Sequence, residues 1–356
     1  MSYRKIGFGI IGCGMISEFH INALLALRDK ARIIGITDVN RDSAERVAAS
    51  HEDFRIFDSV EDMLESKEIG AVCICTPSGY HADAIIKASE AGKNIIVEKP
   101  LAITKEQLDE VMRVCRANRT TVAVISQLRF AKDIRKAKIM LENGELGTLC
   151  CADMYMKYFR SQEYYDSGSW RGTKKIDGGG ALMNQGIHGV DLLLYLVGGI
   201  KSVFAYSSTL ARKIEVEDTL SATLEFESSA LGVIQATTSV FPGYPRRIEL
   251  NGSHGSITIE ETAITRMDID GSVTDDLTFR QPVFSSASSA MNFSGDYHTL
   301  QIADFIDAIH EKRRPFVDLA EGRKAVDVIL AIYRSAREGR RVFLEEMYPV
   351  HNTNYC

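Results

Sequence analysis

The sequence predicts an α/β domain with a parallel sheet over residues 1–126, followed by an α+β domain with a large, mostly antiparallel sheet over residues 127–356. Three observations support this prediction. A chain of 356 residues is long for a single hydrophobic core, so two domains are expected. In the first third, apolar runs alternate with helical patterns, which is typical of βα units. In the second half, several strands alternate apolar and polar residues, which is typical of an antiparallel sheet with one polar face.

The composition indicates an ordinary soluble globular protein, with 45% hydrophobic and 25% charged residues. A net charge of -6 and the absence of a long Lys/Arg block disfavour a nucleic-acid partner. No apolar segment is long enough to cross a membrane, and the first residues lack a signal-peptide pattern. The seven cysteines form no CxxC pair, so we expect reduced thiols, no metal site and a cytoplasmic location.

The first element is an apolar strand over residues 5–12, which runs into a glycine turn and then a helix. Gly12 permits a tight turn, and Gly14 lets the backbone approach a pyrophosphate. The start of the helix, near Met15 and Ile16, supplies free N–H groups for that anion. This order of elements predicts a Rossmann dinucleotide-binding domain.

The second strand, residues 32–38, ends in Asp38, at the position where a dinucleotide fold binds the adenosine ribose. The Asp38 carboxylate would repel a 2′-phosphate, so NAD is favoured as the cofactor. Arg41 could reach such a phosphate, or it could be a simple exposed helix residue. NADP is therefore not excluded.

The run from 69 to 76 is apolar throughout, as expected for a parallel strand covered on both faces. It ends in a loop at the carboxyl edge of the sheet, where ligands of open α/β folds bind. We expect the cofactor to contact this loop, although its histidine also suits packing against the next helix. The expected contacts are Thr76, Pro77, Ser78 and His81.

A second loop follows the strand over residues 94–97 and contains Glu98-Lys99-Pro100. A lysine at this strand end, beside the expected nicotinamide, is hard to explain by packing alone. Glu98 and Lys99 are therefore assigned to the cofactor site. The remaining elements expected in this domain are helices over 42–50, 82–92 and 104–118, a minor strand near Phe57, and a strand over 121–126.

The second domain is predicted as an antiparallel sheet with helices on one side. A face left without helices would suit burial in a homodimer or homotetramer. The expected strands cover 148–158, 202–211, 219–226, 231–240, 248–250 and 256–260, and the expected helices cover 132–143, 297–312 and 319–337.

Residues 176–199 read as an amphipathic helix with a polar face. Asn184, His188 and Asp191 lie along that face at helical spacing. The glycines 178–180 ahead of the helix allow a tight turn and the close approach of another backbone or a ligand. Alternatively, this is a packing helix whose polar side chains make satisfied hydrogen bonds.

Four motifs occur in one order along the chain: Gly12/Gly14, TPxxxH at 76–81, EKPLA at 98–102, and GGGALMNQGIHGVD at 178–191. With these motifs the sequence resembles the Gfo/Idh/MocA oxidoreductase family from residue 5 to about residue 340. The resemblance implies a Rossmann domain and a second domain built on a large, open-faced, mostly antiparallel sheet. It also implies hydride transfer between a nicotinamide cofactor and a CH–OH group of a sugar, sugar derivative or cyclitol.

By this resemblance, Lys99 and His188 match the family's catalytic pair. A neutral His188 would take the hydroxyl proton, and the Lys99 cation would stabilise the developing alkoxide. Asp191 could orient His188, contact the substrate or Lys99, or be a structural carboxylate. The position four before the histidine is Asp in inositol-dehydrogenase-like members but Asn184 here, and Asn cannot hold a proton. We therefore assign Asn184 to substrate binding.

Trp170 and Arg171 precede the glycines in the segment expected to form a wall of the pocket. The indole could stack on a sugar ring, and the guanidinium could bind a carboxylate or phosphate of a sugar nucleotide. Trp170 could instead pack at a domain boundary.

Two other functions are compatible with the same motifs. Some relatives keep NAD bound and use transient oxidation to cleave a glycosidic bond, so that no net NADH forms. A non-catalytic dinucleotide sensor is less compatible with the joint presence of Lys99 and His188.

Overall fold

The computed structural model describes residues 4–51, 53–269, 272–273 and 295–347. The chain divides into two compact units, the first comprising Met1–Gln127 and Phe293–Arg323, and the second comprising Leu128–Asn292 and Lys324–Cys356. The predicted division had a single boundary after residue 126. It did not include the return of residues 293–323 to the first unit.

The first unit contains a parallel sheet with the strand order β3-β2-β1-β4-β5-β6 within the described residues. This is the predicted Rossmann arrangement, with the sheet order reversing direction beside β1. Its strands are β1 (Ile6–Ile11), β2 (Ala31–Thr37), β3 (Arg55–Ile56), β4 (Ala71–Ile74), β5 (Asn94–Val97) and β6 (Val122–Val124). Its helices are α1 (Ser17–Ala26), α2 (Arg41–Ala48), α3 (Val60–Glu65), α4 (His81–Glu90), α5 (Lys105–Ala117) and α9 (Gly295–Glu311).

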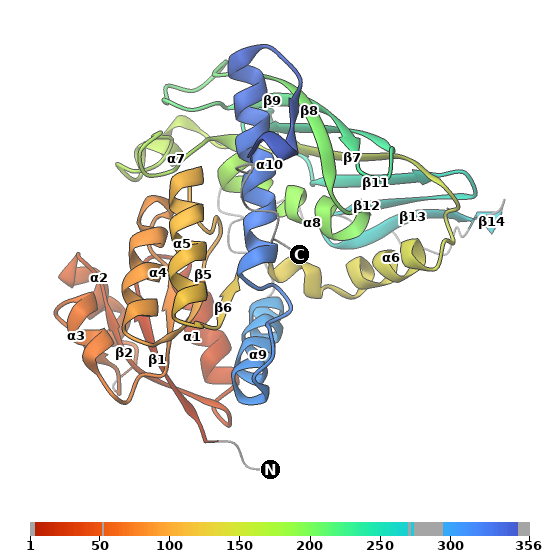
Figure 1. Cartoon of the computed structure of the whole chain (residues 1–356). Helices are drawn as coiled ribbons and strands as arrows, with labels where there is room; N and C mark the ends of the chain where they lie inside the picture. The colour runs from red at the N-terminus through yellow and green to blue at the C-terminus, as the bar shows by residue number, and fades with distance from the viewer. Residues whose placement is uncertain (1–3, 52, 270–271, 274–294, 348–356) are drawn as a thin grey trace. The chain divides into compact units, whose positions relative to one another are not determined.

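Helix α9 completes the core of the first unit although it lies far along the chain. It packs beside α1 on one side of the sheet, while α4 and α5 lie side by side (Figure 1). Phe305 and Ile302 on α9 are fully buried, and the Phe305 ring meets the edge of Phe8 on β1 with 6.4 Å between centroids. Helical periodicity predicted an amphipathic helix here but did not indicate which sheet it covers.

The second unit contains a mixed sheet with the order β14-β13-β12-β11-β7-β10-β9-β8-β15 within the described residues. Only β7 and β10 pair in parallel among these neighbours, so the mostly antiparallel prediction is confirmed. Its strands are β7 (Leu149–Lys157), β8 (Ile200–Ser208), β9 (Thr219–Phe226), β10 (Leu231–Thr237), β11 (Arg247–Gly252), β12 (Gly255–Glu260), β13 (Ala263–Ile269), β14 (Ser272–Val273) and β15 (Val342–Phe343). Its helices are α6 (Lys132–Glu142), α7 (Gln162–Asp166) and α8 (Ile187–Val197), with most of α10 (Leu319–Glu338).

Helices α6 and α8 lie along one face of this sheet (Figure 1). On β7, Met154 and Met156 point to that face and are fully buried. Helix α8 lies close to the sheet because Gly189 has no side chain, and a Cβ there would come within 2.9 Å of Met154 Sδ. None of the helices in the described part of the chain combines the length and apolarity that a membrane span requires.

Candidate active site

The glycine turn of the first unit leaves space for a ligand. Gly12 has a φ of 96°, and a Cβ there would lie 2.8 Å from the Cys75 backbone, so a side chain is excluded. Gly14 differs, because a Cβ built on it meets nothing within 4 Å. Open space at Gly14, next to the start of α1 at Ile16 and Ser17, fits the pyrophosphate expected there. Met15, which lies between Gly14 and Ile16 in the chain, is exposed.

Asp38 ties the glycine turn to the end of β2. Its Oδ2 accepts a hydrogen bond from the Cys13 N–H at 2.7 Å, and its Oδ1 accepts one from the Asn40 N–H at 2.7 Å. Each carboxylate oxygen can accept further bonds, so a ribose hydroxyl can still bind. Arg41 points its guanidinium to Asp58 at 2.8 Å and to Glu45 at 3.1 Å. These ion pairs favour the reading of Arg41 as an exposed helix residue.

His81 connects the two loops at the carboxyl edge of the sheet. Its Nδ1 lies 2.7 Å from the Pro100 carbonyl oxygen, and its Nε2 lies 2.8 Å from the Thr76 carbonyl oxygen. The ring is buried, and burial lowers the pKa of His81. His81 was predicted to contact the cofactor, but its two ring nitrogens instead face the protein backbone. Thr76 Oγ1 is buried without a hydrogen-bond partner in the described chain, and Ser78 beside it begins a short 3₁₀ turn.

Glu98 is buried in the first unit beside two histidines. Its Oε1 lies 3.0 Å from His20 Nε2 on α1 and 3.6 Å from His298 Nε2 on α9. Burial would raise the pKa of Glu98, but the hydrogen bond with His20 and the nearby His298 ring outweigh burial and hold its pKa well below the usual range. Burial lowers the pKa of His20. These contacts favour a structural role for Glu98 over the predicted contact with the cofactor.

These three side chains also form a group that could hold a metal ion. One ligand atom of each of His20, Glu98 and His298 lies within 4.8 Å of the others, and all three residues are buried. No metal site was expected from the sequence, because the three residues are far apart in the chain. Within the described residues, His20 Nδ1 and both ring nitrogens of His298 have no hydrogen-bond partner, whereas histidines that bind metals usually donate the second ring N–H to a partner. A buried His20–Glu98 hydrogen bond with the His298 ring beside it therefore describes this group better.

Lys99 follows Glu98 at the end of β5 and is half-buried. Its backbone N–H donates to Glu98 Oε2 at 3.3 Å. The loop is thus fixed on both sides of Lys99, by Glu98 in the core and by the contact between Pro100 and His81. Because β4 and β5 are neighbours, the Thr76 and Lys99 loops lie together at one edge of the sheet, as the sequence predicted.

In the second unit, the predicted polar helix begins with a π-helical turn, Ala181–Gly186, and continues as α8. Such turns are uncommon and frequently occur at functional sites. Asn184 lies in the π turn and His188 in the first turn of α8, and both are half-buried. Ile187 and Val190 are buried beneath them, so apolar packing fixes the helix that carries His188.

The glycines before this helix accommodate protein atoms. A Cβ on Gly180 would collide with the Glu217 backbone, and one on Gly179 would collide with the Tyr333 hydroxyl. The Glu217 carboxylate accepts bonds from the N–H groups of Gly180 and Leu182, each at 2.9 Å, and from the Tyr333 hydroxyl at 2.8 Å. Burial raises the pKa of Glu217. The glycines were expected to allow the close approach of either a ligand or another backbone. At Gly180 it is another backbone, that of Glu217, that approaches closely.

Asn184 has a partner that the sequence did not reveal. Its Nδ2 donates to Asp177 Oδ1 at 2.6 Å, and Asp177 Oδ2 accepts from the Gly172 N–H at 2.8 Å. Asp177 is 3% exposed. The available signal was a carboxylate directly before three glycines, but such a position also suits an ordinary turn residue.

Asp191 forms a buried ion pair with Arg129. Its two carboxylate oxygens lie 2.9 Å from Arg129 Nε and 2.7 Å from Arg129 Nη2, and the two side chains are 6% and 2% exposed. Removing one partner of such a pair typically costs 3–5 kcal/mol. This ion pair favours the structural role for Asp191, one of the alternatives that the sequence left open.

Trp170 and Arg171 belong to a cluster of aromatic and cationic side chains. The Arg171 guanidinium lies 4.5 Å from the ring centroids of both Trp170 and Tyr164 and donates to the Tyr164 hydroxyl at 2.8 Å. Arg160 lies over the same Tyr164 ring at 5.5 Å. Gln185, next to Asn184, also donates to the Tyr164 hydroxyl, at 3.2 Å, which links the cluster to the polar helix.

The chain matches two family models. Residues 6–126 match an oxidoreductase family with an NAD-binding Rossmann fold, and residues 134–258 match the GFO/IDH/MocA C-terminal domain. It is 27% identical to scyllo-inositol 2-dehydrogenase (NAD(+)) of Bacillus subtilis (strain 168), covering 96% of this chain and 97% of the relative. It is 24% identical to D-glucoside 3-dehydrogenase of Escherichia coli (strain K12), covering 97% and 99% of the two chains.

Among solved structures, the chain resembles the WlbA dehydrogenase from Bordetella pertussis in complex with NADH and UDP-GlcNAcA. The TM-score is 0.86 at 33% identity, covering 98% of this chain and 100% of that one.

Proposed function

Because the chain belongs to the Gfo/Idh/MocA oxidoreductase family, we propose that it is a dehydrogenase that transfers a hydride between NAD and a CH–OH carbon of a sugar, sugar derivative or cyclitol. The polar helix carries this proposal, since His188 and Asn184 lie one turn apart on a helix fixed by buried packing. Bound NAD would be the hydride acceptor. His188 takes the hydroxyl proton, the Lys99 cation stabilises the forming alkoxide, and Asn184 binds the substrate.

We propose NAD as the cofactor used in turnover. The Asp38 carboxylate lies at the ribose end of the glycine turn, and Arg41 is engaged by two carboxylates. Both observations disfavour a bound 2′-phosphate.

The net charge of -6 supports a small-molecule substrate over a nucleic acid. Six free cysteines are compatible with a reducing, cytoplasmic location, and the seventh, Cys356, lies outside the described residues.

We propose that the preferred substrate is an anionic sugar, such as a sugar nucleotide. The cluster of Arg160, Arg171 and Tyr164 with Trp170 offers guanidinium groups for phosphate or carboxylate oxygens and aromatic faces for a ring. The WlbA dehydrogenase was solved with UDP-GlcNAcA bound, which supports this choice.

The test is NADH formation from NAD, and NADPH formation from NADP, over a panel of polyols, aldoses and sugar nucleotides. Arg171→Leu should raise the KM for a sugar nucleotide by about tenfold, the loss of one or more charge-assisted hydrogen bonds, and should leave the KM for a neutral polyol unchanged. Arg266→Leu, which removes an exposed arginine paired with Asp268, is the matched control. Equal rates with neutral and anionic substrates would refute the preference.

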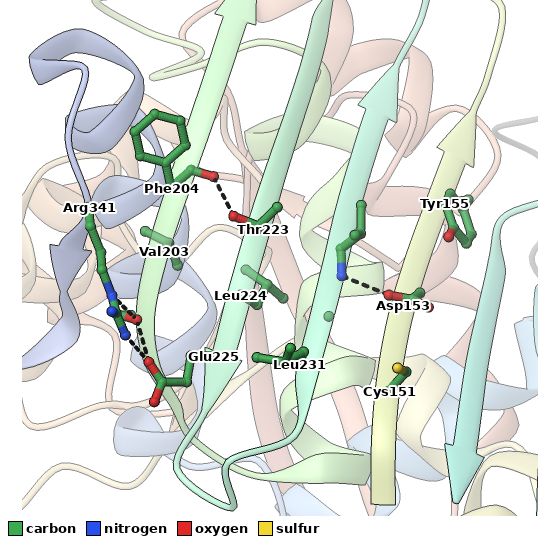
Figure 2. A pocket seen from close by; sticks show the side chains of 13 residues that line it. Cys151, Asp153, Tyr155, Val203, Phe204, Thr223, Leu224, Glu225, Leu231 and Arg341 are labelled. Carbon is green, nitrogen blue, oxygen red and sulfur yellow. Dashed lines mark hydrogen bonds and ion pairs between the residues drawn. The ribbon is translucent and has the colours of Figure 1, made fainter.

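We propose that the uncovered face of the second sheet is buried in a homodimer or homotetramer. The exposed side chains Tyr206 and Leu231 lie on this sheet. A hollow of about 590 Å³ lies over β7, β8, β9 and β10. Figure 2 shows its lining side chains, with the ion pair between Arg341 and Glu225 among them. The hollow contains none of the catalytic candidates, so it suits a packing role better than a substrate role.

Analytical ultracentrifugation tests this assembly. The wild-type chain should sediment as a dimer or tetramer, and Leu231→Glu should shift it to the monomer, because a charge would be buried at the interface. Ile139→Glu, at a comparably exposed apolar position on α6, should leave the mass unchanged. A monomeric mass for the wild type would contradict the proposal.

A further inference from the structure

Asp177 is a buried carboxylate that has no assigned role in the proposed reaction. It lies in a turn closed by backbone hydrogen bonds from the Asp177 and Gly178 N–H groups to the Thr173 carbonyl, at 3.1 and 3.3 Å. Its side chain bonds on one side to Asn184, in the polar helix, and on the other to the Gly172 N–H, in the loop that carries Arg171. One carboxylate therefore connects the two segments assigned to the substrate.

The contact with Asp177 settles which way the Asn184 amide faces. In this contact the Asn184 Nδ2 group donates and Asp177 Oδ1 accepts, so the NH₂ group of the amide faces Asp177. The 2.6 Å separation of Asn184 Nδ2 and Asp177 Oδ1 is typical of a strong, charge-assisted bond. The Asn184 carbonyl oxygen, Oδ1, is then directed away from Asp177.

The second bond fixes the loop with the cationic cluster. Gly172 has a φ of 68°, and a Cβ there would lie 2.7 Å from Ile214 Cγ2, so the backbone is closely confined. Gly172 directly follows Arg171, and its backbone N–H donates to Asp177. The side chains of Arg171 and Gln185 meet again at the Tyr164 hydroxyl. Loop and helix are therefore held together at two points, Asp177 and Tyr164.

We propose that Asp177 is a positioning residue that presents Asn184 Oδ1 as a hydrogen-bond acceptor to a substrate hydroxyl. Through Gly172, Asp177 also holds the loop that carries Arg171 beside the polar helix. This inference rests on the proposed function, because it assigns Asn184 to the substrate. Four residues before His188, this chain has a neutral amide whose NH₂ group is bonded to a carboxylate. The negative charge is kept nearby, but the group facing the hydroxyl cannot take its proton. His188 is then left as the base.

The experiment compares three variants with the wild type. In Asp177→Asn, the Asn184 amide loses its fixed direction, so kcat/KM for the best substrate should fall by on the order of 10²-fold, as small misplacements can cause. NAD affinity should not change. The double variant Asp177→Asn/Asn184→Asp exchanges the amide and the carboxylate, which preserves their hydrogen bond. It should recover at least tenfold of the loss and add a new acidic ionisation to the pH profile of kcat/KM, because a carboxylate now faces the substrate.

Asp166→Asn is the matched control, since it removes an exposed carboxylate on α7 that accepts only from Gln162 in the described structure. Thermal melting separates activity loss from unfolding. Asp177→Asn with near-wild-type kcat/KM, or a double variant that recovers activity without the new ionisation, would overturn the proposal. Absence of NADH formation by the wild type would overturn the proposed function and this role together. Loss confined to the variants leaves the function intact.

Discussion

Replacing His188 with alanine should lower kcat by about 10²–10⁴-fold, the range that a positioned general base contributes. His188 lies in the first turn of α8, half-buried, above the buried Ile187 and Val190. Truncation removes the imidazole without disturbing this apolar packing, so the fold should persist. The glycine turn that is expected to bind NAD belongs to the other unit, so NAD should still bind.

The measurement pairs steady-state NADH formation with NAD titration followed by fluorescence. His254→Ala is the matched control, because His254 is an exposed histidine of the second unit, in the turn between β11 and β12. It should behave as the wild type. Near-normal turnover in His188→Ala would remove His188 from the acid/base role.

Replacing Lys99 with alanine should lower kcat by about 10²–10³-fold. This is the typical effect of removing one preorganised group that stabilises developing charge. The loop should keep its conformation, because Glu98 remains held by His20 and the Pro100 carbonyl remains bound to His81. NAD affinity should therefore stay close to that of the wild type.

Lys105→Ala serves as the control. Lys105 begins α5, and its ammonium pairs with Asp109 four residues later at 2.6 Å, a contact that contributes only about 0.3–0.5 kcal/mol to stability. It should not change kcat. If Lys99→Ala lost activity only because NAD no longer bound, the role of the ammonium in the chemical step would be wrong.

The elements with local signals were predictable from the sequence. The strand, glycine turn and helix at the N-terminus placed Gly12, Gly14 and Asp38 correctly relative to one another, because their geometry depends on neighbouring residues and on parallel strand order. The alternation in residues 219–226 likewise predicted a strand with one buried face, which β9 is. Helices α3 and α7 and strand β13 are short or weakly patterned and were not predicted.

The side-chain partners were less predictable, because they depend on contacts between distant segments. Glu98 follows a buried strand and was expected beside the cofactor, but His20 and His298 lie on two helices that the sequence does not place against it. Arg129 and Asp191 are 62 positions apart, and nothing local pairs them. The composition of a loop or helix face therefore indicates which side chains are polar, but not which are already engaged by the protein.

The proposed function requires net hydride transfer from a sugar-like substrate to NAD. It is tested most directly by incubating the purified wild-type chain with NAD and a responsive sugar nucleotide, and measuring both products. NADH from its absorbance and oxidised sugar from mass spectrometry should accumulate in equal amounts. A cleaved or otherwise converted sugar without any accumulated NADH would contradict the claim and would favour a reaction in which the cofactor is recycled within each turnover.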